Sequence, residues 1–279
     1  MRHETIAAAV MASFVGEIEA FKPGNVSIYA DGHDMTVQDF IKSAEVSVPI
    51  LCDQKNSFGQ RILNSVKATR KAVGCNTNLG MLLLFVPIII AAENGAKTEE
   101  ELRQILEITL SSLTKDDANL VFKAISLANP GGLGRVDSQD VNDAPDCSLL
   151  EAMQLACERD YIALQYTNNF EDIFGTGLVQ IKSFVKRWNS VKWSAVACYL
   201  SWMSTIDDSH IQRKYGHQIA EQIKIKSKAV ADKFFSSSNP EADIDLLKQF
   251  DEELKAKKYN PGTCADLTAA SILVYNLTS

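Results

Sequence analysis

The sequence is short of basic residues and has no apolar run long enough to cross a membrane. Its 28 lysines and arginines are outnumbered by 35 aspartates and glutamates, which gives a net charge of −7. A general nucleic-acid binder would need a basic face, so this balance argues against that class. The most apolar stretch, residues 79–92, is shorter than the roughly 20 residues of a membrane span and contains Pro87. We therefore expect neither a nucleic-acid partner nor a membrane partner.

Paired cysteines are also missing. The six cysteines are scattered along the chain, without a C-x-x-C pair. Residues 1–4 contain no basic region of the kind that precedes the apolar segment of a secretory signal. This cysteine usage predicts a reduced, cytoplasmic protein without structural zinc.

Alternating strand patterns are absent, and apolar residues recur instead every three or four positions, as in helices. Pairs with capping-box spacing support helix starts. The segments with helical spacing are residues 6–21, 37–51, 62–73, 102–113, 120–127, 149–164, 191–203, 211–235 and 267–277. The capping pairs are Thr36 with Asp39, Thr98 with Glu101, Thr114 with Asp117, Ser148 with Glu151, and Thr263 with Asp266. We predict an all-α fold, a compact multi-helix bundle of roughly ten helices that forms a single domain over residues 1–279.

Five of the joints between these segments are polar and centred on glycine. The joint at residues 129–135 carries Gly131, Gly132 and Gly134, although the end of a helix needs only one glycine. Three glycines let the backbone come close to an anion. The other joints are residues 22–25, 74–80, 207–216 and 260–263. Together they predict one polar site built from several loops.

Two groups of acids stand at predicted helix ends. Glu17 and Glu19 close the first helix, where a carboxylate opposes the helix dipole, so they are either functional or a solvated helix end. Asp31 and Asp34 flank a glycine and a histidine. Their oxygens suit a hard cation such as Mg²⁺, and the alternative is an Asp-Gly turn that caps the next helix.

Two further helix starts suit phosphate. Asn76, Thr77 and Asn78 precede the apolar helix, where backbone amides favour an anion, although plain capping would need only one of them. Arg213 can grip a phosphate with two hydrogen bonds and Lys214 as a point charge. The alternative for this second pair is a capped helix with local charge partners.

Two acids remain. Asp266 could bind a metal ion, but its place three residues after Thr263 explains it completely as the partner in a helix cap. Asp140 follows the glycine-rich joint in a polar loop and has no capping role.

Four segments, taken in order, resemble the triphosphoribosyl-dephospho-CoA synthase family. They are Lys22-Pro23-Gly24-Asn25-Val26, Gly32-His33-Asp34-Met35, Gly74-Cys75-Asn76-Thr77-Asn78-Leu79-Gly80 and Asn260-Pro261-Gly262-Thr263-Cys264-Ala265-Asp266-Leu267. The ordered set spans nearly the whole chain. The resemblance implies an all-α transferase that uses ATP and 3′-dephospho-CoA and releases adenine.

The implied reaction is a substitution at the anomeric carbon of the ATP ribose by the 2′-hydroxyl of dephospho-CoA. Such a reaction needs a base, a cation for the triphosphate, and donors for the departing adenine. The catalytic candidates are Glu17 and Asp34. The candidate ligands of Mg²⁺ are Asp34, Asp140, Asp207, Asp208 and Asp266. The candidate substrate and phosphate ligands are Lys22, Asn25, Asn76, Thr77, Asn78, Gly131, Gly132, Gly134, Arg213 and Lys214.

The sequence also departs from the family pattern. Family members usually have histidine and lysine where this chain has Asn78 and Leu79. One alternative is therefore a related nucleotide-dependent enzyme that acts on another coenzyme precursor, in the biosynthesis of one-carbon carriers. A second alternative is a non-catalytic nucleotide-binding protein of the same fold. Assembly into a homo-oligomer is left open.

Overall fold

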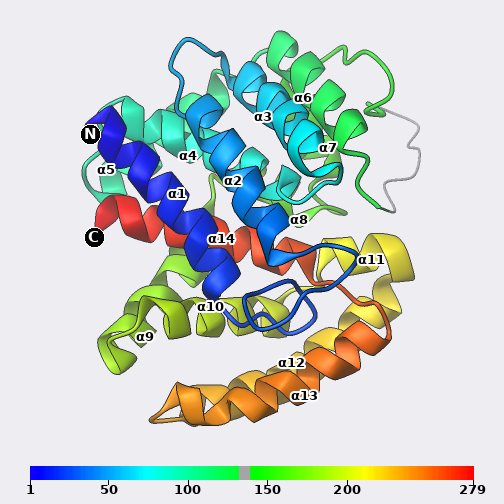
Figure 1. Ribbon diagram of the computed structural model, residues 1–279. Helices are drawn as coiled ribbons and strands as arrows, with labels where there is room; N and C mark the ends of the chain where they lie inside the picture. The colour runs from blue at the N-terminus through cyan, green and yellow to red at the C-terminus, as the bar shows by residue number, and fades with distance from the viewer. Residues whose placement is uncertain (132–138) are drawn as a thin grey trace.

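The computed structural model describes residues 1–131 and 139–279 and confirms the all-α prediction (Figure 1). Within these residues the chain forms fourteen α-helices, one π-helical turn and one 3-10 turn. The α-helices are α1 His3–Glu19, α2 Val37–Leu51, α3 Phe58–Val73, α4 Leu79–Glu93, α5 Glu99–Ser111, α6 Lys115–Ala128, α7 Leu149–Ala156, α8 Tyr161–Thr167, α9 Val179–Trp188, α10 Val191–Thr205, α11 Ser209–Tyr215, α12 His217–Ser236, α13 Ile244–Ala256 and α14 Gly262–Thr278. The π-helical turn is Ile173–Leu178 and the 3-10 turn is Pro240–Asp243.

The helix count exceeds the expected ten for two reasons. Apolar periodicity continues across short breaks, so residues 149–164 include α7 and the beginning of α8, and residues 211–235 include most of α11 and of α12. The second break falls at Gly216, whose φ of 89° interrupts the helix. Helices α9 and α13 were missed altogether.

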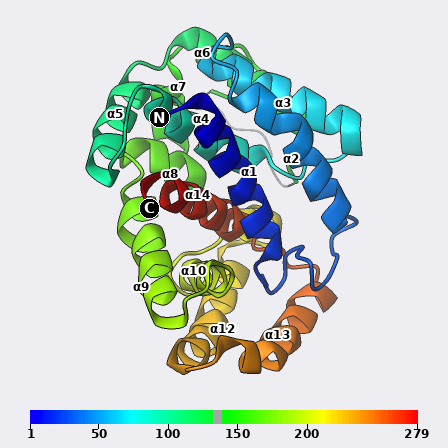
Figure 2. The same ribbon diagram turned by 60° about the vertical axis from the view of Figure 1, so that its left-hand side comes forward.

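The core is organised around α4. All of its residues except Ile90 and Glu93 are buried, so the helix is apolar on every side and continues through Pro87. It packs against α5 and α14, and α14 in turn packs against α1 and α10. Figures 1 and 2 show α12 and α13 side by side at one end of the molecule, away from α4. No helix in the described parts of the chain combines the length and apolar character of a membrane span.

Four of the five expected capping boxes are confirmed, at the starts of α2, α5, α6 and α7. The fifth is wrong. Helix α14 begins at Gly262 with Pro261 in the capping position, so Thr263 lies inside the helix and Asp266 is not its capping partner. The Thr263 hydroxyl instead accepts a hydrogen bond from the backbone N–H of His210, at 3.2 Å.

Asp208 joins the starts of two helices that are far apart in sequence. Its Oδ1 accepts hydrogen bonds from the backbone N–H groups of His210 and Ile211 in α11, at 2.9 and 3.0 Å. Its Oδ2 accepts one from the backbone N–H of Cys264 in α14, at 2.8 Å. The residue is buried, so the N–H groups of Ile211 and Cys264 depend on the carboxylate and not on water.

We expect Asp208→Ala to lower the free energy of unfolding by about 3 kcal/mol or more, because it leaves buried N–H donors of two helices without an acceptor. Chemical denaturation followed by circular dichroism measures this change. The matched control is Asp207→Ala, which removes partly exposed ion pairs and is expected to cost less than about 1 kcal/mol. Equal losses in the two variants would contradict the double cap.

Candidate active site

A cavity of about 580 Å³ lies where five helices begin. Its lining includes residues at or near the first turns of α4, α7, α8, α11 and α14: Leu79, Leu149, Ile162, His210 and Thr263. The volume is within the range of about 300–1,000 Å³ that is usual for small-molecule sites. Because helix N-termini carry partial positive charge, their convergence favours an anionic ligand.

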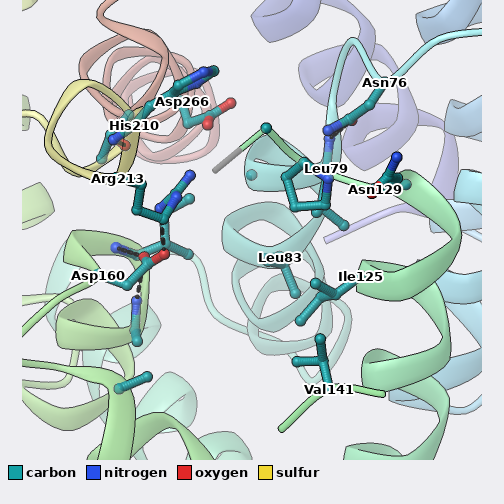
Figure 3. A pocket seen from close by; sticks show the side chains of 18 of the residues that line it. Asn76, Leu79, Leu83, Ile125, Asn129, Val141, Asp160, His210, Arg213 and Asp266 are labelled. Carbon is teal, nitrogen blue, oxygen red and sulfur yellow. Dashed lines mark hydrogen bonds and ion pairs between the residues drawn. The ribbon is translucent and has the colours of Figure 1, made fainter. Parts of the chain in front are cut away.

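The cavity has a polar end and an apolar end. Figure 3 shows Asp266, His210, Arg213 and Asp160 together on one side of it. On another side, Leu83 of α4 and Ile125 of α6 come together, with Val141 beside them (Figure 3). A ligand that fills this cavity therefore needs both charged and apolar groups.

Asp266 lies directly against the first turn of α4. A Cβ atom on Gly80 would come within 2.0 Å of the Asp266 Oδ2, a distance that no side chain tolerates. Glycine at position 80 is therefore required for the carboxyl group to occupy this place. The Gly80 of the sequence motif thus serves the approach of a side chain from α14.

The surroundings of Asp266 are rich in acids. Burial raises its pKa well above the usual range, and the nearby Glu17, Asp208 and Asp160 add to this effect, while Lys22 opposes it. No hydrogen bond to another described residue satisfies the carboxyl group. Such a group is stabilised by a proton or by a bound cation.

His210 is a neutral imidazole inside the cavity wall. Burial and the neighbouring Arg213, Lys214 and His33 lower its pKa to about 3. A Cβ atom on Gly262 would come within 2.6 Å of its Nδ1, so the glycine makes room for the ring. Its Nε2 is buried and has no hydrogen-bond partner among the described residues. The ring therefore offers a hydrogen-bonding atom that the protein does not use.

Two cationic side chains of α11, Arg213 and Lys214, line the cavity and differ in their ion pairing. Arg213 is paired with Asp160 at 2.8 Å, and Asp160 also caps α8 by accepting from Ile162 and Ala163. Lys214 forms no ion pair within the described parts of the chain, and its side chain packs against Gly131, where a Cβ atom would come within 2.5 Å of Cε. Lys214 is consequently the α11 cation whose charge remains available to a ligand.

Asp34 reaches the cavity from a tight turn. His33 and Asp34 have φ values of 56° and 60°, and the turn is closed by hydrogen bonds between Gly32 and Met35. The His33 Nε2 lies 2.8 Å from the Gly24 carbonyl oxygen, which ties the turn to the preceding loop. The capping interpretation holds for Asp31, which accepts from the Val37 N–H of α2, whereas Asp34 is exposed and lines the cavity.

Of the three polar residues before α4, only Asn76 lines the cavity. Its Oδ1 accepts from the Leu79 N–H at 3.1 Å. Thr77 donates to Ser43 at 2.6 Å, and Asn78 donates to Ser47 and Thr69 at 3.1 and 3.2 Å. The last two side chains are buried and hold α2 and α3 against the start of α4.

Glu17, Lys22 and Asn25 lie behind the cavity wall. They are buried, and Lys22 donates to both Glu17 and Asn25. Burial raises the pKa of Glu17 and lowers that of Lys22, and the attraction between the two opposes both shifts. Glu17 therefore belongs to an internal ion pair, whereas Glu19 is exposed, as expected of a solvated helix end.

The remaining acids are not brought to the cavity. Asp208 is used in helix capping, and Asp207 pairs with Lys224 at 2.8 Å and lies 3.3 Å from His217. Asp140 accepts from the backbone and side chain of Asn142 at 2.9 and 2.8 Å. No group of three histidines, cysteines or acids among the described residues is placed to hold a metal ion. Gly132 and Gly134 lie outside the described residues, whereas Gly131 lines the cavity.

Sequence reasoning missed several lining residues. Arg70, Asp160 and His210 were not among the candidates, yet all three line the cavity. Asp160 stands at the start of α8 and Arg70 in the last turn of α3, and neither belongs to a sequence motif. His210 follows the acid pair of the joint at residues 207–216, which was the one available signal.

Comparisons with known proteins identify the family of the chain. The family model of ATP:dephospho-CoA triphosphoribosyl transferase matches residues 3–279. The fold is similar to the crystal structure of a proposed triphosphoribosyl-dephospho-CoA synthase from Archaeoglobus fulgidus, with 25% sequence identity and a TM-score of 0.64. That alignment covers 83% of this chain and 95% of the other. Among curated proteins, none matches this sequence. The chain belongs to the ATP:dephospho-CoA triphosphoribosyl transferase family.

Proposed function

We propose that the protein transfers the triphosphoribosyl group of ATP to the 2′-hydroxyl of 3′-dephospho-CoA within this cavity. The bond between ribose C1′ and adenine N9 breaks, and a bond between C1′ and the acceptor oxygen forms. The acceptor proton passes to a base, and adenine leaves with a proton. The observation that carries the proposal is the cavity itself, which combines helix N-termini, a cation that pairs with no described acid, carboxyl groups and an apolar wall.

The triphosphate is assigned to the polar end of the cavity. Lys214 supplies a charge that no described acid neutralises, and Arg70 adds a second from the end of α3. The N-terminus of α4 contributes backbone amides beside Asn76. Arg213 holds Asp160 and is better suited to orienting the wall than to neutralising phosphate.

The general base is assigned to Asp34. Glu17, the other catalytic candidate, is buried against Lys22 and does not line the cavity. Asp34 lines it from an exposed turn, where a carboxylate can accept the proton of an incoming hydroxyl.

Magnesium fits this site as a companion of the triphosphate. Mg²⁺ is commonly held by one or two carboxylates together with substrate phosphates, and Asp266 is a carboxyl group among excess acids. When bound, the ion would neutralise charge on the triphosphate. Asp266 would hold it, and Gly80 would keep Asp266 in place.

Departure of adenine is assigned to His210. Its imidazole is neutral because its pKa lies at about 3, so it does not repel the positive charge that develops at the ribose. Its Nε2 is buried and has no described protein partner, so a rotation of the ring toward the cavity would let this atom hydrogen-bond the base.

A second candidate keeps ATP and changes the acceptor. Leu79 lines the cavity, at the position where the family pattern has a lysine. It extends the apolar wall of Leu83 and Ile125, which favours an acceptor with more apolar surface. Another coenzyme precursor, of the kind used for one-carbon carriers, would meet this condition.

The first test is adenine release. Purified protein with Mg²⁺, ATP and dephospho-CoA should release adenine, detected by liquid chromatography, and should release none when dephospho-CoA is left out. Absence of adenine with dephospho-CoA excludes that acceptor. Adenine release on addition of other coenzyme precursors would then establish the second candidate.

Asp34→Asn should lower kcat by roughly 100- to 10,000-fold, because the amide cannot accept the hydroxyl proton. Affinity for ATP, measured by calorimetry, should change little. The control is Asp31→Asn, in the same loop but occupied with the start of α2, which should keep nearly full kcat. An unchanged kcat in Asp34→Asn would remove Asp34 from the chemistry.

Gly80→Ala should raise the Mg²⁺ concentration needed for half-maximal activity by roughly 10- to 100-fold, because the added methyl group displaces the Asp266 carboxyl group. The control is Gly16→Ala, where a Cβ atom makes only ordinary contact with Ile272, at 3.6 Å. A Mg²⁺ requirement that Gly80→Ala leaves unchanged would show that Asp266 does not hold the ion.

A further inference from the structure

Three buried polar side chains form a line that leads from α1 to the cavity. The Lys22 Nζ donates to the Asn25 Oδ1 at 2.8 Å, and the Asn25 Nδ2 donates to the Asn260 Oδ1 at 2.7 Å. Exposed fractions are 0% for Lys22, 5% for Asn25 and 8% for Asn260. Asn260 alone of the three lines the cavity. It was not among the site residues expected from the sequence.

The order of hydrogen-bond donors and acceptors along this line is fixed, because the line starts at the donating Nζ of a lysine. Whether the proton shared with Glu17 resides on nitrogen or on oxygen, the Lys22 Nζ carries hydrogens to donate, so the Asn25 oxygen must face it. The Asn25 amide group then presents its Nδ2 to Asn260, and the Asn260 oxygen must face Asn25. Reversal of either amide would set donor against donor in a buried place, at considerable cost.

This fixed order of donors and acceptors determines which atom Asn260 presents to the cavity. With its oxygen held by Asn25, Asn260 has its Nδ2 left over, and this group has no hydrogen-bond partner among the described residues. The side-chain atoms that are fully buried and lack a partner do not include the Asn260 Nδ2. This nitrogen is therefore accessible from the cavity. Asn260 thus offers a donor, and not an acceptor, to whatever occupies the cavity.

The neighbours of Asn260 indicate the chemistry of the acceptor. On one side, Gly262 contacts the ring of His210. On the other, Pro261 lies against Gly24, whose carbonyl oxygen is bound to His33. Both histidines experience the charge of Lys214. A donor amide in the same part of the cavity as an ammonium group that no described acid neutralises is suited to an anionic oxygen.

We propose that Asn260 binds a phosphate oxygen of the ligand through its Nδ2, and that Lys22 and Asn25 are positioning residues that fix this polarity. The inference rests on the proposed function, since both proposed substrates carry phosphates. The phosphate belongs either to the triphosphate of ATP or to the diphosphate of dephospho-CoA. Lys22 and Asn25, which were expected to bind phosphate themselves, act on it only through Asn260.

The test is calorimetric binding of three probes: inorganic triphosphate, ATP and dephospho-CoA. Asn260→Ala should weaken the probe that carries the contacted phosphate by roughly 10- to 100-fold, the effect of one hydrogen bond to a charged group. Asn260→Asp should weaken it further, because a carboxylate then faces the phosphate. A loss confined to triphosphate and ATP assigns the contact to the donor substrate, and a loss confined to dephospho-CoA assigns it to the acceptor.

Asn25→Asp tests the relay without changing the cavity wall. The new carboxylate accepts from Lys22 and also from the Asn260 amide, which then turns its oxygen toward the ligand. Binding should fall at least as far as in Asn260→Ala. The control is Asn276→Asp, which alters a partly buried amide bound to Ser13, away from the cavity, and should bind as the wild type does. Thermal denaturation of each variant confirms that it is folded.

Several results would overturn the inference. Wild-type protein that binds none of the three probes excludes a phosphate at Asn260. Wild-type affinity in a folded Asn260→Ala excludes the contact, and wild-type affinity in a folded Asn25→Asp excludes the relay. An equal loss in Asn276→Asp shows a general effect of charge. Because binding is measured apart from adenine release, failure of the proposed reaction would leave these results interpretable.

Discussion

The hydrogen bonds accepted by Asp208 determine how the polar end of the cavity is built. Its carboxylate holds the first turns of α11 and α14 together, and these two turns carry His210 and Asp266. Thr263 adds a second link between the same turns, through the His210 N–H. Without a shared acceptor, two helix N-termini would repel each other at close range. The cavity therefore depends on a residue that does not line it.

The buried polar groups behind the wall give orientation more than stability. A buried ion pair such as Glu17 with Lys22 contributes little net free energy of folding, because desolvation offsets the attraction between the charges. It does dictate which atom of each neighbouring amide donates and which accepts. In the proposed site, this fixed polarity directs an amide donor toward the ligand without adding a further charge to the cavity wall.

The two ends of the cavity fit the two demands of the proposed transfer. Helix N-termini, Lys214 and Arg70 favour a polyphosphate, whereas Leu79, Leu83 and Ile125 form a wall that favours the uncharged part of a coenzyme precursor. Glycine at positions 80, 131 and 262 allows Asp266, Lys214 and His210 to approach the backbone. These three glycines thus serve the close approach of side chains, and only indirectly the ligand.

The sequence by itself determined the features that depend on neighbours along the chain. Helical periodicity and four capping boxes lie within a few residues, so the all-α fold and most helix starts could be predicted, and the ordered motifs indicated the family. Only the tertiary structure decided which polar residues meet. Asp34, Asn76 and Asp266 line the cavity, whereas Asp207 and Asp208 do not, although all five are polar residues close to the start of a helix. The reason is that each orientation is set by partners far away in sequence, such as Gly80 for Asp266 and Cys264 for Asp208, and no local pattern records them.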